Sequence, residues 1–251
     1  MSETMDTTDI TVTDEAGIRH VRLTRPAKRN ALTRAMYEQL AAALREADAD
    51  ASIGAVLISG EGHAFCAGND LVDFLANPPK GEDSAVVRFL MSLIEVRVPI
   101  VAAVHGQAVG IGATMLLHCD FAVADETAVL SYPFVPLGLV PEAGSSLLLP
   151  QIAGSKLAAR LLYLGEPIGA REALEAGLVT SVVAPGEQLD AARHLAGKVA
   201  ALPRDAVRST RALIRGPEET TVERIRREAA VFVERLGSPE FAEQAQRFLG
   251  R

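Results

Sequence analysis

The chain has 251 residues, of which 49% are apolar and 23% charged, and the charges are mixed along the sequence rather than gathered in blocks. This composition predicts a globular chain, long enough for one large domain or one domain with an appended segment. A net charge of −7 argues against nucleic acid as a partner, although a local basic patch can still bind an anionic ligand. No apolar run is long enough to span a bilayer, so we expect no membrane association.

The first half of the chain alternates short apolar runs with helical patterns. Asp14 to Gly17 is expected to turn a hairpin, and Thr33 is expected to cap the first helix. The expected elements are strands at 10–13, 18–24, 55–59, 99–104, 121–124 and 128–131, and helices at 33–47 and 85–96.

The second half becomes mainly helical from Gly144 onward. Pro203 suits the first turn of a helix, and Gly216-Pro217 is expected to end that helix. The expected elements are helices at 157–164, 170–176, 187–201, 203–214, 218–236 and 239–249, and a strand near 178–182. Strands alternating with helices predict an α/β fold with crossover connections.

The two cysteines and the two ends of the chain indicate where the protein is located and whether it binds a metal. Cys66 and Cys119 make no disulfide framework and show no zinc-ligand spacing, so we expect no metal site. Residues 1–9 have no secretory features, and the last three residues match no retention or peroxisomal address. We therefore expect a cytoplasmic protein, with Cys66 and His118 serving in packing or hydrogen bonding.

A glycine-rich turn follows the buried strand at 99–104. It runs from His105 to Thr114, with glycines at 106, 110 and 112, and a helical pattern continues after it. The first N–H groups of a helix have no intrahelical partner, and the helix dipole there favours negative charge. Glycine lets a ligand approach such a backbone closely.

A second turn of the same kind lies upstream. The strand at 55–59 leads to Ala64-Phe65-Cys66-Ala67-Gly68-Asn69-Asp70-Leu71, which opens another helix. Two such turns can bring two main-chain N–H donors to one point. That arrangement is an oxyanion hole made of backbone alone.

The pair of turns resembles the crotonase superfamily of enoyl-CoA hydratases and isomerases, from about Ile18 to the C-terminal helices. The resemblance implies a ββα superhelix with a helical C-terminal segment. It implies a core at 1–195, and a segment at 196–251 that covers the acyl pocket and makes a trimer contact. It also implies a homotrimer or dimer of trimers, an acyl-CoA substrate, and no cofactor besides the CoA of the substrate.

The family's donor positions fall on Asn69 and Ile111, which would act through their backbone N–H groups. Ile111 departs from the usual glycine, and we expect its side chain to narrow the approach. Hydratases of the family carry two glutamates, and the matching positions here are Thr114 and Phe134. Neither residue can act as a carboxylate base.

A carboxylate follows a little further on, at Glu142 in Pro141-Glu142-Ala143-Gly144. This segment resembles the eukaryotic Δ3,Δ2-enoyl-CoA isomerases, whose corresponding glutamate is the sole acid/base. One carboxylate suffices to move a proton from C2 to C4 of a 3-enoyl thioester. Apolar neighbours would raise the pKa of Glu142. The competing interpretation is a surface acid in the first turn of a helix.

Two groups of residues are candidates for binding CoA. By resemblance the first group lies beside the phosphates and the second places its backbone at the adenine. The candidates are Ala27, Lys28 and Arg29, then Ala67, Asp70 and Leu71. Lys28 and Arg29 can neutralise phosphate charge, whereas Asp70 can instead cap a helix.

The leading hypothesis is an enoyl-CoA isomerase of fatty-acid-type metabolism. An enoyl-CoA hydratase is the nearest alternative, with Asp70 or Asp120 as its carboxylate. A non-catalytic acyl-CoA-binding homologue is the alternative from another class. The direction in which the Glu142 carboxylate points separates these hypotheses.

Overall fold

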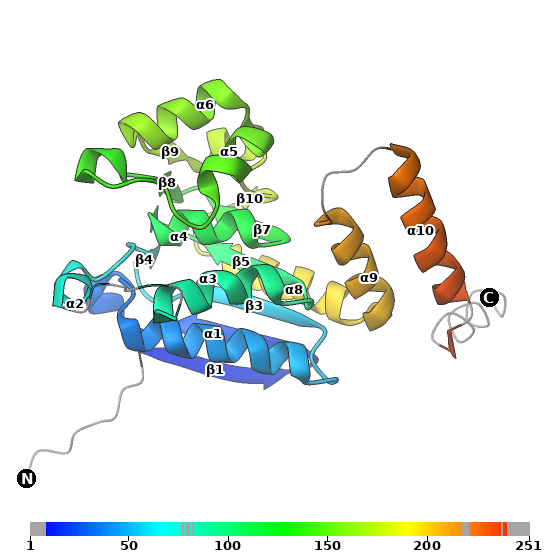
Figure 1. Ribbon diagram of the computed structural model, residues 1–251. Helices are drawn as coiled ribbons and strands as arrows, with labels where there is room; N and C mark the ends of the chain where they lie inside the picture. The colour runs from blue at the N-terminus through cyan, green and yellow to red at the C-terminus, as the bar shows by residue number, and fades with distance from the viewer. Residues whose placement is uncertain are drawn as a thin grey trace, which may run out of the picture.

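The computed structural model describes residues 9–76, 78, 81, 83–216, 221–236 and 238–239. The chain forms two β-sheets with helices around them, and two further helices extend to one side (Figure 1). Apart from residue 239, the helix expected at 239–249 lies outside the described residues, as does the N-terminal segment 1–8.

The predicted strands and helices that fall within the described residues are present in order. The strands are β1 (Ile10–Glu15), β2 (Ile18–Leu23), β3 (Ala55–Gly60), β4 (Ala64–Cys66), β5 (Ile100–Val104), β6 (Gln107–Val109), β7 (Phe121–Asp125), β8 (Val129–Ser131), β9 (Ile168–Gly169) and β10 (Ser181–Val183). The α-helices are α1 (Arg34–Ala49), α2 (Leu71–Ala76), α3 (Ala85–Glu95), α4 (Ile111–Thr114), α5 (Ser145–Ala153), α6 (Ser155–Ala159), α7 (Ala170–Glu175), α8 (Gln188–Ala200), α9 (Arg204–Ile214) and α10 (Thr221–Leu236). Of these elements, β4, β6, β9 and α5 are present where no strand or helix was predicted. Within the described ranges, no helix is long and apolar enough to cross a membrane.

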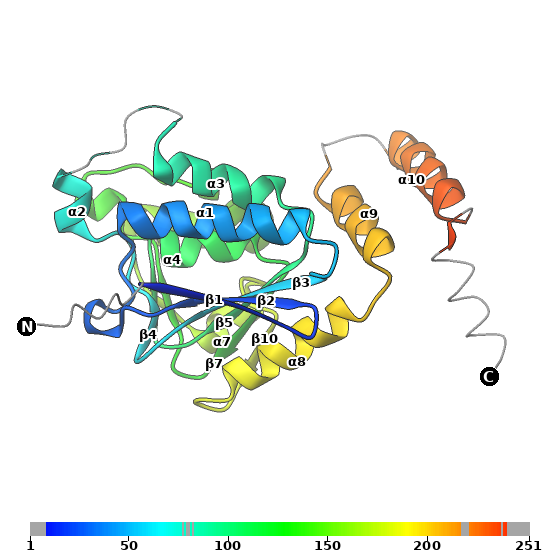
Figure 2. The ribbon, with the colours of Figure 1, turned by 90° about the horizontal axis from the view of Figure 1, so that it is seen from below.

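The larger sheet has the order β1-β2-β3-β5-β7-β10. β1 and β2 form the predicted antiparallel hairpin, and the remaining neighbours pair in parallel. In Figure 2 this sheet lies between α1 and α3 on one face and α8 on the other. Because side chains alternate along a strand, Val56 and Ile58 of β3 join the main core while Ala55 and Leu57 pack under α8.

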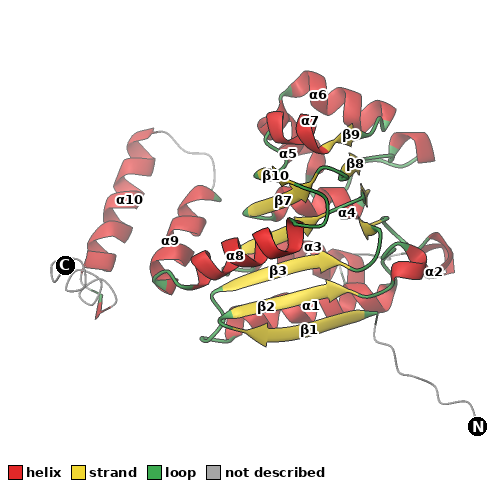
Figure 3. Ribbon diagram, turned by 180° about the vertical axis from the view of Figure 1, so that it is seen from behind, coloured by secondary structure: helices red, strands yellow, loops and turns green. Residues whose placement is uncertain are grey.

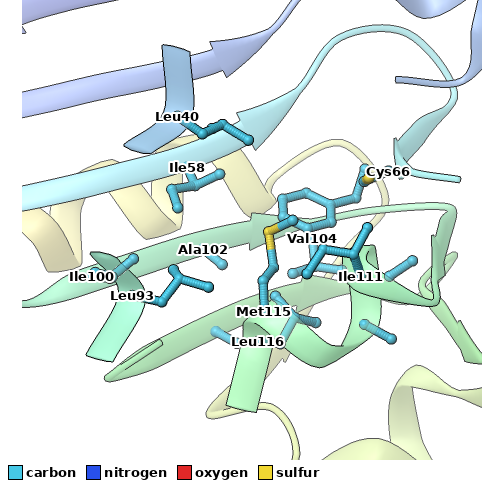
Figure 4. Packing of buried hydrophobic residues seen from close by; sticks show 14 of the residues in the cluster. Leu40, Ile58, Cys66, Leu93, Ile100, Ala102, Val104, Ile111, Met115 and Leu116 are labelled. Atoms are coloured by element: carbon cyan, nitrogen blue, oxygen red, sulfur yellow. The ribbon is translucent and has the colours of Figure 1, made fainter. Parts of the chain in front are cut away.

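The main core fills the space between the larger sheet and the helices α1, α3 and α4. Figure 4 shows Leu40, Ile58, Val104 and Met115 packed together there. Burying each aliphatic side chain of this size contributes about 1.5–3 kcal/mol. The site described below rests on this rigid base.

The smaller sheet has the order β4-β6-β8-β9. β4, β6 and β8 pair in parallel, so their carboxyl ends meet at the same edge. Each of these strands leads into a loop or helix at that edge. In open α/β sheets, ligands bind outside the carboxyl ends of the strands.

Two C-terminal helices extend from the body of the protein (Figures 1 and 3). The guanidinium of Arg211 anchors α9 through a 2.9 Å ion pair with Asp120. α10 packs along α9, and its Ile225 and Phe232 are exposed. The domain boundary predicted at residue 195 falls within α8, and the division remains a prediction.

Local differences from the predictions have local causes. Pro203 is the N-cap of α9 rather than part of its first turn. The helix expected at 157–164 divides into α6 and a π-helical turn at Arg160–Leu164. The strand expected near 178–182 begins later, at Ser181, because Leu178 and Val179 turn into the core first.

Candidate active site

The first turn connects β4 to α2 and is held by the chain segment at Leu32. The N–H of Leu32 donates to the carbonyl of Gly68 at 2.7 Å, and the N–H of Asp70 donates to the carbonyl of Leu32 at 2.9 Å. Because these two bonds flank Asn69, its own N–H points away from Leu32. That N–H has no acceptor among the described residues.

The second turn connects β6 to α4 through Gly110. The carbonyl of Gly110 accepts hydrogen bonds from Ala113 and Thr114, at 2.9 and 2.8 Å. The N–H of Ile111 therefore lies in the first turn of α4, where no intrahelical acceptor exists. In the part of the chain that the structure covers, this N–H also meets no other acceptor.

Close backbone contact brings the two turns together. A Cβ atom on Gly112 would lie 2.4 Å from the carbonyl oxygen of Cys66, so only glycine fits there. Gly68 adopts a φ of +93°, and a Cβ on it would meet the carbonyl oxygen of Val109 at 3.0 Å. Asn69 directly follows Gly68, and Ile111 directly precedes Gly112, so both candidate donors adjoin these two contacts.

The side chain of Ile111 is buried in the main core, near Val104 and Met115 (Figure 4). Core packing therefore holds the residue that replaces the family's usual glycine. The side chain of Ile111 belongs to the main core, whereas its main-chain N–H belongs to the candidate site.

Glu142 lies in the loop after β8, close to the two turns. Its Oε1 accepts a hydrogen bond from the hydroxyl of Thr114, a fully buried residue of α4. Burial raises the pKa of the Glu142 carboxyl, and the hydrogen bond from Thr114 opposes that rise. The carboxylate points inward, which disfavours the interpretation as a surface acid at a helix start.

Backbone strain and a histidine fix the turn that carries Glu142. Ala143 has a φ of +53° and Gly144 a φ of +66°, and α5 begins directly afterwards. A non-glycine residue in this region costs about 1–2 kcal/mol. The ring nitrogen Nε2 of His118 bonds the carbonyl of Ala143 at 2.7 Å, so His118 has the hydrogen-bonding role predicted for it.

The two positions where hydratases carry glutamates have other uses here. Thr114 serves as the hydrogen-bond partner of Glu142. Phe134 is 8% exposed and packs into the main core. The sequence identified the missing carboxylates but gave no sign that Thr114 would contact Glu142.

Tyr37 is a further residue at the site, and the sequence analysis missed it. Its hydroxyl, which comes from α1, donates to Oδ1 of Asn69 at 2.6 Å. Burial and the nearby charge of Glu142 raise the pKa of Tyr37 well above its usual value. Its helical spacing with Leu40 and Leu44 indicates only a core position.

A cavity of about 350 Å³ adjoins Tyr37 between α1, α2 and the start of α3. Its apolar lining includes Leu32, Tyr37, Phe74, Ala85 and Val86, and its polar and charged lining comprises Arg34, Asp73, Asp83 and Ser84. This volume is in the range of small-molecule sites. Among the described residues, neither Glu142 nor any residue of the two turns lines this cavity, which meets the site through Tyr37.

The structure brings the two groups of CoA candidates together. The N–H of Ala67 donates to the carbonyl of Arg29 at 2.9 Å. Ala27, Lys28 and Leu71 are exposed beside this contact. Asp70 caps α2, accepting from Val72 at 3.1 Å, and its ion pair with Arg25 lowers its pKa.

Other predicted residues have structural roles. Cys66 is buried in the core, and burial raises the pKa of its thiol to about 12, which confirms its predicted packing role. Asp120 accepts from the N–H of Ile100 and pairs with Arg211. Among residues whose placement is described, no three His, Cys, Asp or Glu side chains are grouped to hold a metal.

The fold is α/β, and the candidate site combines two main-chain N–H groups that have no acceptor among the described residues with the carboxylate of Glu142, which bonds Thr114. The sequence model of the family "Enoyl-CoA hydratase/isomerase" matches residues 13–251, and the chain belongs to that family. Membership confirms the predicted crotonase superfamily and its fold, near the enoyl-CoA isomerases, and the protein is an enoyl-CoA isomerase or hydratase.

Two of the relatives that match are named as isomerases. Enoyl-CoA delta isomerase 2 of Rattus norvegicus is 36% identical over 225 residues, which are 87% of this chain and 57% of that protein. The chain thus spans just over half the length of the rat protein. The 1,2-epoxyphenylacetyl-CoA isomerase of Escherichia coli (strain K12) is 33% identical, over 83% of this chain and 82% of that protein.

A solved structure shows the same fold over almost the full length. The enoyl-CoA hydratase of Polaromonas sp. JS666 has a TM-score of 0.89 and 33% identity, covering 96% of each chain.

Proposed function

We propose that this protein shifts the double bond of a 3-enoyl-CoA to give 2-enoyl-CoA, with Glu142 as the single acid/base. The observation that carries the proposal is the contact between Glu142 and Thr114, which holds one inward-pointing carboxylate beside both turns. The name of the rat relative, enoyl-CoA delta isomerase 2, agrees with this assignment.

Each step has an assigned group. The thioester oxygen accepts hydrogen bonds from the N–H groups of Asn69 and Ile111. The Glu142 carboxylate removes a proton from C2, and the electron pair moves into a dienolate whose oxygen the two donors stabilise. The protonated Glu142 then returns the proton at C4, which leaves the double bond between C2 and C3.

The raised pKa of Glu142 suits both halves of this cycle. A glutamate with its ordinary pKa is a weak base towards C2. Because burial raises the pKa of Glu142, its carboxylate binds the C2 proton more readily and holds it until the proton is delivered to C4. The loss of one main-chain donor typically costs about 3 kcal/mol of transition-state stabilisation.

Substrate binding is assigned to the surfaces around the turns. CoA lies against Ala27, Lys28, Arg29, Ala67, Asp70 and Leu71, and the acyl chain enters the cavity beside Tyr37. CoA is part of the substrate, and the reaction uses no other cofactor. We place the enzyme in fatty-acid-type metabolism in the cytoplasm.

The protein is further proposed to assemble as a homotrimer or dimer of trimers. Apolar side chains are exposed around Glu142, including Leu139 and Val140, and on α10, including Phe232. Val140 is 80% exposed. Subunit contacts would cover these surfaces, and sedimentation at micromolar concentration tests this: a stable monomer contradicts it.

The hydratase alternative finds less support in the contacts. The two carboxylates considered for it, Asp70 and Asp120, are each held in an ion pair with arginine. The deciding experiment incubates the purified protein with 3-enoyl-CoA and with 2-enoyl-CoA and separates the products. The proposal expects interconversion of the two thioesters, and 3-hydroxyacyl-CoA as the main product would refute it.

A further inference from the structure

Tyr37 of α1 contacts the first turn, which connects β4 to α2. The Tyr37 side chain is 2% exposed, and its ring packs on Phe89 of α3 with 5.6 Å between the ring centroids. Its hydroxyl donates to Asn69 Oδ1 at 2.6 Å. Helices α1 and α3 therefore determine where the Asn69 side chain lies.

The side-chain oxygen of an asparagine at a turn usually bonds the main chain rather than another side chain. Its carboxamide commonly accepts a hydrogen bond from a nearby main-chain N–H two or three residues along. Here Oδ1 of Asp70 accepts from the first N–H groups of α2, those of Val72 and Asp73, at 3.1 and 3.2 Å. The Asn69 side chain is instead turned toward α1.

The main chain of Asn69 is held equally firmly. Hydrogen bonds to Leu32 flank it on both sides, while its own N–H is left without a protein acceptor among the described residues. The side-chain bond to Tyr37 adds a third restraint on the same residue. A donor held in place before substrate arrives needs little reorganisation during the reaction.

We propose that Tyr37 is a positioning residue of the oxyanion hole, whose hydroxyl fixes Asn69 so that its N–H meets the thioester oxygen. The proposal rests on the function proposed above and adds to it a residue of α1 that contacts neither the thioester nor the transferred proton. A tyrosine hydroxyl is protonated at neutral pH, and burial raises the pKa of Tyr37 further, so this hydroxyl remains able to donate.

The experiment compares Tyr37→Phe with a matched control. Tyr37→Phe removes one oxygen and keeps the ring that packs on Phe89. The control is Tyr132→Phe, because Tyr132 is also fully buried but its hydroxyl has no hydrogen-bond partner in the described structure. Tyr132→Phe removes a buried hydroxyl that holds no described residue in place, so it reports the effect of losing a buried tyrosine oxygen without the contact to Asn69.

Two readouts are measured, one with turnover and one without. The first is kcat and KM for 3-enoyl-CoA. The second is the pH at which bound acetoacetyl-CoA converts to its enolate, followed by the near-ultraviolet absorbance of the enolate. This second readout reports oxyanion stabilisation even if the protein has no isomerase activity, so it separates failure of this inference from failure of the proposed function.

For Tyr37→Phe we expect kcat to fall about three- to tenfold with KM changed less than about twofold. Enolate formation should shift upward by about half to one pH unit, and Tyr132→Phe should match the wild type. An unshifted enolate transition in Tyr37→Phe, or an equal shift in both variants, would overturn the proposal.

A second variant covers the case in which Tyr37→Phe does not fold. Asn69→Ala keeps the main-chain N–H but removes the oxygen that Tyr37 contacts, so it should produce the same enolate shift. Combining the two substitutions should add no further shift where both fold. A wild-type enolate transition in Asn69→Ala would overturn the proposal.

Discussion

Replacement of Glu142 by glutamine should abolish most turnover while leaving the fold and CoA-thioester binding intact. Glutamine has nearly the same shape, and its side-chain oxygen can still accept the hydrogen bond from Thr114. It cannot accept a proton from C2 or return one to C4. The loss of a general base lowers rates by roughly 10²- to 10⁴-fold, equivalent to about 3–5 kcal/mol in the barrier.

The pH dependence of the wild type and of Glu142→Gln follows from the raised pKa of Glu142. The wild type needs the carboxylate, so its kcat should fall on the acidic side through a single ionisation that lies above the usual pKa of glutamate. Any residual rate of Glu142→Gln should show no such acidic limb.

Stability gives an independent check with a definite sign. Burial raises the pKa of Glu142 in the folded state, so the protonated form favours folding. That contribution is present below the pKa of the unfolded chain and is lost as pH rises through the folded pKa. Glu142→Gln should therefore be at least as stable as the wild type at neutral pH, measured by urea unfolding. An unchanged isomerase rate in the folded variant would refute the role of Glu142.

Three further changes test other parts of the site. Thr114→Val should raise the acidic limb of the pH–rate profile by about one pH unit, because the hydrogen bond that it removes favours the ionised form of Glu142, the proposed base; an unmoved limb contradicts this. Lys28→Ala combined with Arg29→Ala should weaken CoA-thioester binding and reduce its salt dependence, whereas an unchanged Kd at low and high salt removes both residues from the site. Gly112→Ala should destabilise the fold by roughly 1–3 kcal/mol because its Cβ would strike the main chain of β4; Gly169→Ala, which has open space around its Cβ, is the control in urea unfolding.

Local signals in the sequence were sufficient for much of the fold. The apolar run of β3 and the strand before the glycine-rich turn are fully buried, as their composition predicts. Thr33 caps α1 by accepting from the N–H of Met36, as its position predicts. These features depend on neighbours in the chain, which is why a single sequence indicates them.

Features that depend on distant contacts were not predictable in this way. Helix α5 contains Pro150, a residue that normally argues against a helix interior. The hydrogen bond from Tyr37 to Asn69 joins residues 32 positions apart, and the hydrogen bond from Thr114 to Glu142 joins residues 28 positions apart. Neither has a periodicity or motif that marks it.

The resemblance and the fold contributed differently to the candidate site. The resemblance selected Asn69, Ile111 and Glu142 from their motifs, and the fold then placed Thr114 against Glu142. A threonine at that position indicates only a missing carboxylate when the sequence is considered alone. Its role as a hydrogen-bond donor becomes visible once the loop after β8 is positioned over α4.

The central claim is that one carboxyl group moves one proton within the substrate. The most direct test uses 3-enoyl-CoA with both C2 hydrogens replaced by deuterium, followed by mass spectrometry and NMR of the earliest product formed in ordinary water. The account predicts 2-enoyl-CoA that carries deuterium at C4 in at least part of the product. A product with added water, or 2-enoyl-CoA with no deuterium at C4 from the first turnovers, would contradict it.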